Sequence, residues 1–320
     1  MATAPARAGS DWETTQGVAE EDHYGPRGRS EWLDIDWREH QRWLRVANRW
    51  VNVIEVGEGP PLLFVHGHSG RWANWLENIP HLARTRRVVA LDLPGFGASD
   101  MPAEPISIEN YARTLDAVCE ELEIDAAAVV GNSMGGFVSA ELAIKFPQRV
   151  ERLVLVSAAG LSTQYIGLSS EHFRRRSVGA FARVVNAYAG IPEARAETLM
   201  RRGRLRRAIL NVVVRHPDRL PAPICTELIR GSGKPAAPAA TDTIMSYDFR
   251  DRVSEIACPT LIVWGADDRI VPAHSADEYK RLIPDTRKEI FADTGHVAMV
   301  ERPARFNRVL QEFLAEGPEG

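Results

Sequence analysis

Two kinds of hydrophobic pattern divide the chain. Before residue 60, apolar and polar positions alternate: Leu33, Ile35 and Trp37 alternate with aspartates in WLDIDW (32–37), and WVNVIEV (50–56) alternates again. Alternation of this kind is typical of a strand with one buried face. The segment GEGPP then breaks the second run, as turn residues do. We therefore expect these two runs to pair as an antiparallel hairpin.

From residue 60 onward the apolar residues form continuous runs, which are typical of strands covered on both faces. Helical periodicity lies between them. Ser107 is a candidate N-cap of one helix, a second runs from Met134 to Phe146, and a third covers 304–314. The expected strands are LLFVHG (62–67), RVVALDLPG (87–95), AAAVVGNS (126–133), RLVLVSAAG (152–160), TLIVWG (260–265) and EIFADTGH (289–296). The alternation of expected strands and helices along the chain predicts an α/β protein with a mostly parallel, doubly wound sheet.

One long stretch, residues 161–254, interrupts the alternation of strands and helices. It contains helical patterns and the segment GSGKPAAPAAT (231–241), but no strand signal. Structureless loops of that length are uncommon in compact domains, so we expect an inserted helical lid. The core then comprises residues 31–160 and 255–316. Residues 1–30 are polar and interrupted by Gly and Pro, which predicts a disordered tail.

Composition narrows the class of protein. The 320 residues are 44% hydrophobic and 26% charged with a net charge of −4, whereas a nucleic-acid-binding domain is expected to be strongly basic. No apolar run has the length of a membrane-spanning helix, and the N-terminal residues contain no apolar signal-peptide core. The three cysteines lack C-x-x-C spacing, which indicates reduced thiols. We expect a cytoplasmic protein, monomeric or homodimeric, that acts on a small molecule and not on nucleic acid.

The segment GNSMG (131–135) carries the strongest chemical signal. It has the G-x-S-x-G spacing, and it stands between an expected strand and an expected helix. In that context the serine, Ser133, is placed on a sharp turn with its hydroxyl exposed, and the flanking positions must be small. The N-terminus of the following helix would also favour a developing oxyanion. Ser133 is therefore a candidate nucleophile.

A serine nucleophile needs a base, and the base needs an orienting carboxylate. His296 follows the last expected strand, at the same sheet edge as Ser133. Asp268 follows the strand TLIVWG in WGADDRIVP, again at that edge. Asp267 in the same loop is the alternative to Asp268, which we favour. The candidate triad is therefore Ser133, Asp268 and His296.

An oxyanion hole needs two backbone N–H donors. The amide of Met134 directly follows the nucleophile, and the loop HGHSG (66–70) offers the amide of His68. The His68 side chain has the alternative reading of a base or a metal ligand. His66 is expected to brace the loop by hydrogen bonds.

Five blocks in order resemble the α/β-hydrolase superfamily: FVHG (64–67), DLPGFGASD (92–100), GNSMGG (131–136), WGADDRIVP (264–272) and GH…ERPARFNRVLQEFL (295–314). The likeness covers about residue 45 to 315 and points to the lidded branch with carboxylesterases, lactonases and meta-cleavage C–C hydrolases. It implies Ser133 as nucleophile, His296 as base and Asp268 as orienting acid, with the amides of His68 and Met134 as the oxyanion hole. It implies no metal and no cofactor. Haloalkane dehalogenases and epoxide hydrolases, by contrast, resemble this chain but have aspartate in place of the serine.

Two departures bear on the reaction. C–C hydrolases of this branch share GNSMGG and the final FNR, but they usually have a glycine-rich oxyanion loop and a tryptophan after the catalytic histidine. This chain has HGHSGRW and Val297 there. We therefore interpret it as a hydrolase of esters or lactones that works through an acyl-enzyme, with C–C hydrolysis of dienoates as the alternative. Acyltransferase, perhydrolase and thioesterase activities, and a small-molecule receptor of this fold, are further alternatives.

Asn132, Trp72, Val297 and Phe173 are candidate substrate-binding residues, and Trp72 has the alternative of packing against a helix. Residues 172–219 are rich in arginine, which we read as a solvated helix face. The alternatives are contact with an anionic membrane surface and recognition of a substrate carboxylate by an arginine at 174–176. Asp92 and Asp100 are expected to stabilise turns.

Overall fold

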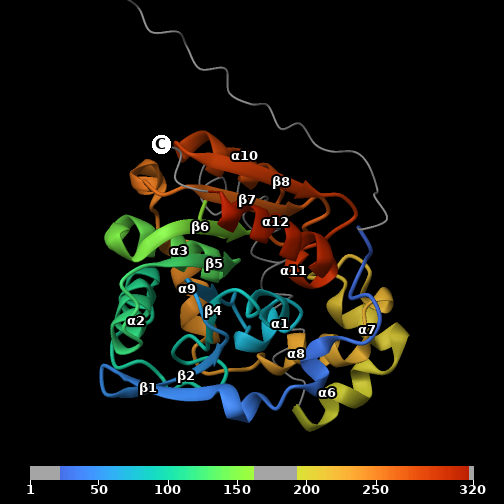
Figure 1. Ribbon diagram of the computed structural model, residues 1–320. Helices are drawn as coiled ribbons and strands as arrows, with labels where there is room; N and C mark the ends of the chain where they lie inside the picture. The colour runs from blue at the N-terminus through green and yellow to red at the C-terminus, as the bar shows by residue number, and fades with distance from the viewer. Residues whose placement is uncertain (1–21, 162–192, 317–320) are drawn as a thin grey trace, which may run out of the picture.

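Eight strands form one sheet, in the order β1-β2-β4-β3-β5-β6-β7-β8, in the computed structural model, which describes residues 22–161 and 193–316 (Figure 1). The β1–β2 and β2–β4 pairs are antiparallel, and all other neighbours are parallel. The strands are β1 (Gln41–Val46), β2 (Arg49–Val56), β3 (Pro61–Val65), β4 (Arg87–Leu91), β5 (Ala127–Asn132), β6 (Val150–Val156), β7 (Thr260–Gly265) and β8 (Thr286–Phe291).

The six strands predicted from continuous apolar runs are confirmed as β3 to β8. Every residue of the interior strands β5 and β7 is buried, as expected when helices cover both faces of a sheet. Successive strand residues contribute to opposite faces: Leu63 and Val65 pack on one side, whereas Leu62 and Phe64 pack on the other. The core therefore consists of two apolar layers separated by the sheet.

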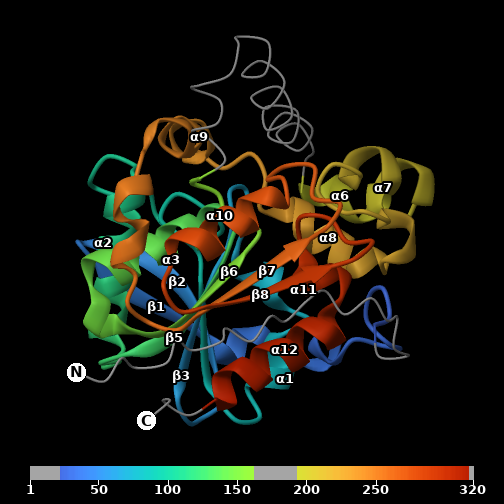
Figure 2. The same ribbon diagram turned by 90° about the horizontal axis from the view of Figure 1, so that it is seen from above.

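The helices form one layer on each face of the sheet (Figure 2). One layer contains α2 (Ile108–Glu121), α3 (Met134–Lys145) and α10 (His274–Leu282). The other contains α1 (Ile79–Leu82), α11 (Ala298–Glu301) and α12 (Pro303–Ala315). The Ser107 hydroxyl accepts a hydrogen bond from Asn110 N, so the predicted cap of α2 is confirmed. The predicted α/β class and doubly wound sheet are confirmed as well.

In the residues that the structure describes, the segment inserted between β6 and β7 consists of helices joined by turns and loops, without a strand. Apolar residues of its first three described helices join one core layer, and those of the fourth join the other. The insertion thus spans the edge of the sheet from one layer to the other. Its helices are α6 (Glu193–Met200), α7 (Gly203–Leu210), α8 (Ala222–Arg230) and α9 (Ala237–Ser246). Short 3-10 turns in the chain are η3 (Trp72–Trp75), η4 (Pro147–Arg149), η5 (Pro217–Arg219) and η6 (Arg250–Glu255).

The prediction of a strand over 32–37 is wrong. That stretch forms two 3-10 turns, η1 (Glu31–Asp34) and η2 (Trp37–His40), and the hairpin is made by β1 and β2 instead. The physical reason is the tertiary position of Trp32, which is buried and donates its indole N–H to Glu77 (2.8 Å), whereas Leu33 is exposed. The hairpin turn is Ala47–Asn48, both with positive φ, as a type I′ hairpin turn requires.

The predicted tail is also wrong for its last residues. Within residues 22–30, Tyr24, Gly25 and Ser30 are buried, and Tyr24 is only 2% exposed. The Gly25 N–H donates to the Glu301 carbonyl (2.7 Å), which ties this segment to the end of α11. Residues 1–21 lie outside the described residues. Within the described part of the chain, no helix is long and apolar enough to cross a membrane.

Candidate active site

Ser133 occupies a strained turn between β5 and α3. Its backbone has φ 56° and ψ −118°, in a region that residues with a side chain rarely adopt. The turn is held by hydrogen bonds from Ser133 N to Val156 O (2.9 Å) and from Ala159 N to Ser133 O (3.0 Å). The surrounding structure therefore imposes this conformation on Ser133, as expected for a nucleophile elbow.

The glycines on either side of Ser133 are required by close backbone approaches. A Cβ atom at Gly131 would lie 2.3 Å from the carbonyl oxygen of Gly135, and one at Gly135 would lie 2.3 Å from the carbonyl oxygen of Val65. Both distances are far below van der Waals contact. The G-x-S-x-G spacing is thus explained by the packing of the turn against β3 and against the start of α3.

The structure brings His296 and Asp268 into direct contact. His296 Nδ1 donates to Asp268 Oδ2 at 2.7 Å, and both residues are buried. The other carboxylate oxygen of Asp268 accepts the N–H groups of Ile270 (2.8 Å) and Val271 (2.9 Å). The alternative acid, Asp267, lies instead 3.6 Å from Arg215 Nε and is partly exposed. With Nδ1 bonded to Asp268, the other ring nitrogen, Nε2, is left for proton transfer.

Ser133 and His296 line the same cavity. Gly67 and His68 of the loop after β3 line it as well, and Met134 follows Ser133 as the first residue of α3. The cavity lies at the carboxyl ends of the parallel strands, where open α/β sheets bind ligands. The arrangement thus places the predicted nucleophile, base and oxyanion loop around one volume.

The imidazole of His68 fastens the oxyanion loop to the inserted segment. Its Nε2 donates to the carbonyl of Ala237 at the start of α9 (2.8 Å), so its Nδ1 accepts from the Ser69 hydroxyl (2.9 Å). Burial lowers the pKa of His68, which favours the neutral ring. These contacts give the His68 side chain a role in positioning the loop.

His66 braces the same loop, as predicted. Its Nδ1 donates to the carbonyl of Gly67 (2.7 Å), and its Nε2 accepts the N–H of Leu93 (2.9 Å). The ring is fully buried, and burial lowers its pKa although the nearby carboxylate of Asp92 opposes the shift. Asp92 accepts the N–H groups of Trp72 (2.8 Å) and Ala98 (2.8 Å), which confirms its predicted role in the turn.

Comparison with known proteins identifies the family. A model of the alpha/beta hydrolase fold matches residues 60–303. The chain belongs to this family. The hydrolase is 31% identical over 278 residues to the 2-hydroxy-6-oxo-2,4-heptadienoate hydrolase of Pseudomonas putida, covering 83% of this chain and 92% of that protein.

Solved structures of relatives share the fold of this hydrolase. A meta-cleavage product hydrolase superposes with a TM-score of 0.68 at 26% identity, covering 88% of this chain and all of that one. A membrane phospholipase A, described as a bacterial virulence factor, superposes with a TM-score of 0.67 at 26% identity, over 86% of this chain and 85% of that one. Enzymes with different reactions thus share this architecture.

The four candidate substrate-binding residues of the hydrolase have different positions. Asn132 and Val297 line the cavity, and Asn132 Nδ2 also donates to the carbonyl of His296 at 3.3 Å. Trp72 does not line it: its ring packs against Trp37, with centroids 5.1 Å apart, so the packing alternative describes its position. Phe173, like the arginines at 174–176, lies outside the described residues.

Several residues at the site of this hydrolase were not among the sequence-based candidates. Leu210, Val213 and Leu228 of the inserted segment line the cavity together with Ile270. Their apolar character alone could not single them out, because apolar residues also fill the core. Glu301, buried behind the loop of His296, was missed as well, although a glutamate in an otherwise apolar helix start (VAMVE) is a usable signal.

Proposed function

We propose that this α/β hydrolase is a serine hydrolase that cleaves carboxylic esters or lactones through an acyl-enzyme on Ser133. The observation that carries the proposal is the geometry around one cavity. Ser133 is held at φ 56°, and His296 lines the same cavity with its Nδ1 bonded to a buried carboxylate. A hydroxyl becomes a useful nucleophile when a positioned base takes its proton.

The proposed reaction has two half-steps. His296 Nε2 takes the proton of Ser133 Oγ as Oγ attacks the ester carbonyl, and the oxyanion accepts hydrogen bonds from the amides of His68 and Met134. The C–O bond to the alcohol then breaks, and His296 returns the proton to the departing alcohol. In the second half-step His296 takes a proton from water as the water oxygen attacks the acyl carbon. The bond between the acyl carbon and Ser133 Oγ then breaks, His296 returns the proton to Oγ, and the acid is released.

The cavity walls favour an uncharged, partly apolar acyl group. Leu210, Val213 and Leu228 from the inserted segment and Ile270 and Val297 from the core supply these walls. Among the residues that the structure describes, no lysine or arginine lines the cavity. A carboxylate buried against such walls would lack a charged partner, which is costly. We therefore expect neutral esters to be better substrates than acidic ones.

The test is hydrolysis of p-nitrophenyl esters from acetate to laurate by the wild type and by Ser133→Ala. We expect turnover by the wild type with an optimum at short or medium chain length, and its loss in the variant to the background rate. The acyl chain length beyond which turnover decreases indicates how long an acyl group the apolar cavity accommodates. Ester turnover that survives in Ser133→Ala would contradict the proposal.

C–C hydrolysis of dienoates is the second candidate, because the relative from Pseudomonas putida with 31% identity is named as a dienoate hydrolase. Its substrates carry a carboxylate, so the cavity walls argue against them here. The discriminating assay follows the loss of visible absorbance of 2-hydroxy-6-oxo-2,4-heptadienoate. A kcat/KM above that for the best neutral ester would make C–C hydrolysis the main activity.

A further inference from the structure

The loop of His296, the proposed base, contacts a second buried carboxylate besides Asp268. Glu301 is the last residue of α11 and is fully buried. Its oxygens accept the N–H of Gly295 (3.0 Å) and the N–H of Val297 (3.3 Å), the two residues that flank His296. A side chain that binds the peptide groups on both sides of a residue fixes that residue's backbone.

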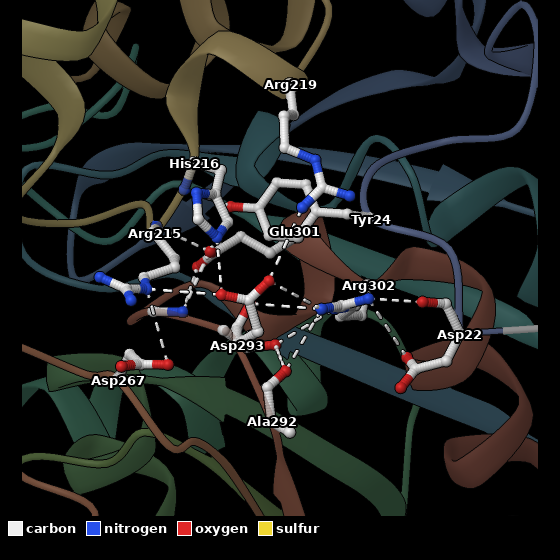
Figure 3. Close-up of polar contacts among 12 residues, drawn as sticks. Asp22, Tyr24, Arg215, His216, Arg219, Asp267, Ala292, Asp293, Glu301 and Arg302 are labelled. Carbon is white, nitrogen blue, oxygen red and sulfur yellow. Dashed lines mark hydrogen bonds and ion pairs between the residues drawn. The ribbon is translucent and has the colours of Figure 1, made fainter. Parts of the chain in front are cut away.

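Glu301 also reaches two other parts of the chain. It accepts the hydroxyl of Tyr24 at 2.6 Å and the N–H of Arg215 at 2.8 Å (Figure 3). Tyr24 Oη accepts in turn from the N–H of His216 at 2.8 Å. Burial raises the pKa of Glu301, and the hydrogen bonds that it accepts from Tyr24 and from the backbone N–H groups oppose that rise, because they favour the ionised form. Three separate segments, the N-terminal 22–25, the inserted 213–216 and the histidine loop, therefore meet at this one carboxylate.

The inserted segment touches the histidine loop at close range. His296 N donates to the carbonyl of Val213 at 2.8 Å, and Val213 itself lines the cavity. A Cβ atom at Gly295 would lie 2.8 Å from that same carbonyl oxygen. The backbone of the inserted segment thus lies directly on the backbone of the histidine loop, and Glu301 lies beneath both.

A cluster of polar and charged side chains around Asp293 lies next to this contact. Asp293 pairs with His216 Nε2 (2.6 Å) and lies 3.6 Å from both Arg219 and Arg302. The Arg219 and Arg302 guanidinium groups also lie over the ring of Tyr24, at 4.7 and 5.1 Å from its centroid. The two arginines restrict the orientation of the Tyr24 ring, and its hydroxyl therefore points at Glu301.

We propose that Glu301 and Tyr24 form a clamp that positions the loop of His296 and joins it to the inserted segment and the N-terminal segment. The clamp rests on the proposed function, because it acts through His296. Glu301 is a positioning residue: it contacts the peptide groups beside His296 and does not line the cavity. Residues 22–25 are then part of the scaffold of the active site.

The test compares Glu301→Gln and Tyr24→Phe with wild type. Glutamine keeps the size of the side chain but replaces one acceptor oxygen by an NH₂ group that faces N–H donors, so the histidine loop must shift. We expect kcat for the best p-nitrophenyl ester to fall by about tenfold or more, since small misplacements of catalytic groups are costly, with KM changed less than about twofold. Tyr24→Phe removes the hydroxyl that donates to Glu301 and accepts from His216 N, but it keeps the ring and the hydrogen bonds of Glu301 to Gly295 and Val297, so we expect a smaller loss of kcat.

Two matched controls separate positioning from general destabilisation. Glu141→Gln alters a fully buried, ion-paired glutamate in α3, and Tyr111→Phe removes a buried tyrosine hydroxyl in the opposite core layer. Each is expected to lower Tm and to leave kcat unchanged. The low-field NMR signal of the His296 Nδ1 proton, which bonds Asp268, gives a second readout that needs no substrate. We expect it to shift or broaden in Glu301→Gln and to stay unchanged in both controls.

The outcomes distinguish the clamp from the function on which it rests. If His296→Ala keeps wild-type activity, the proposed function fails. If His296→Ala is inactive while Glu301→Gln keeps its kcat and its Nδ1 signal, the clamp alone is refuted and Glu301 is purely structural. If Glu301→Gln does not fold, Tyr24→Phe decides by the same two readouts, and an unchanged kcat and signal in that variant overturn the clamp.

Discussion

At the residue scale, the two neighbouring aspartates of the loop after β7 have different surroundings. Asp268 is buried and bonds His296, whereas Asp267 faces Arg215 and is partly exposed. The sequence could place both at the correct edge of the sheet, because both follow a predicted strand. It could favour one of them but could not show which carboxylate turns inward, since that depends on the path of the loop.

Asp268→Asn should lower kcat for esters by about 10³- to 10⁴-fold, because an amide can stabilise the wrong tautomer of the histidine and cannot stabilise its charged form. Asp267→Asn is the matched control in the same loop, and we expect its kcat to stay within about twofold of wild type. Steady-state kinetics with one p-nitrophenyl ester measures both variants. Equal losses in the two variants, or a larger loss in Asp267→Asn, would contradict the assignment.

At the element scale, the sequence predicted the parts of the fold that depend on local pattern. The six parallel strands were readable because continuous apolar runs demand burial on both faces. The cap at Ser107 was readable because capping uses neighbouring residues. The hairpin was misplaced because the burial of Trp32 against Glu77 is a tertiary contact. The hydrogen bond between Tyr24 and Glu301 could not be predicted for the same reason, since the two residues lie at opposite ends of the chain.

The close approach of α3 to β3 at Gly135 predicts the effect of a substitution there. Gly135→Ala would place a Cβ atom 2.3 Å from the carbonyl oxygen of Val65, so α3 must move away from β3. We expect a loss of about 1–3 kcal/mol in the free energy of unfolding, as overpacking typically costs, together with loss of ester turnover. Urea unfolding and kinetics measure the two effects.

Gly203→Ala is the control for that substitution. Gly203 begins α7, and nothing lies within 4 Å of the position its Cβ would take. We expect unchanged or slightly raised stability and unchanged turnover, because alanine favours the helix over glycine. If the two variants behave alike, the close approach of α3 to β3 does not constrain the turn of Ser133.

At the scale of the whole molecule, burial of His66 links stability to pH. Burial lowers its pKa, so the folded protein keeps the ring neutral while the unfolded chain binds a proton as the pH falls below about 6.5. The unfolded state then binds more protons, and the stability present above this pH is lost as the pH falls. His66 alone contributes a loss of up to about 1.4 kcal/mol between about pH 7.5 and about pH 5.5.

Urea unfolding at these two pH values tests the linkage. His66→Gln is less stable than wild type at neutral pH, because it loses the hydrogen bonds to Gly67 and Leu93, but it should lose less stability on acidification. His23→Gln, at an exposed histidine, is the control and should follow wild type. An acid-induced loss as large in His66→Gln as in wild type would show that His66 does not titrate on unfolding.

The central claim is that Ser133 is the nucleophile, and phosphonate labelling tests it most directly. The wild type is treated with an alkyl p-nitrophenyl phosphonate, which forms a stable adduct with an activated serine, and the adduct is located by peptide mass spectrometry. We predict one adduct per chain, on Ser133, with loss of ester turnover in the same proportion. Loss of ester turnover with the adduct on another residue, or with Ser133 unmodified, would contradict the account.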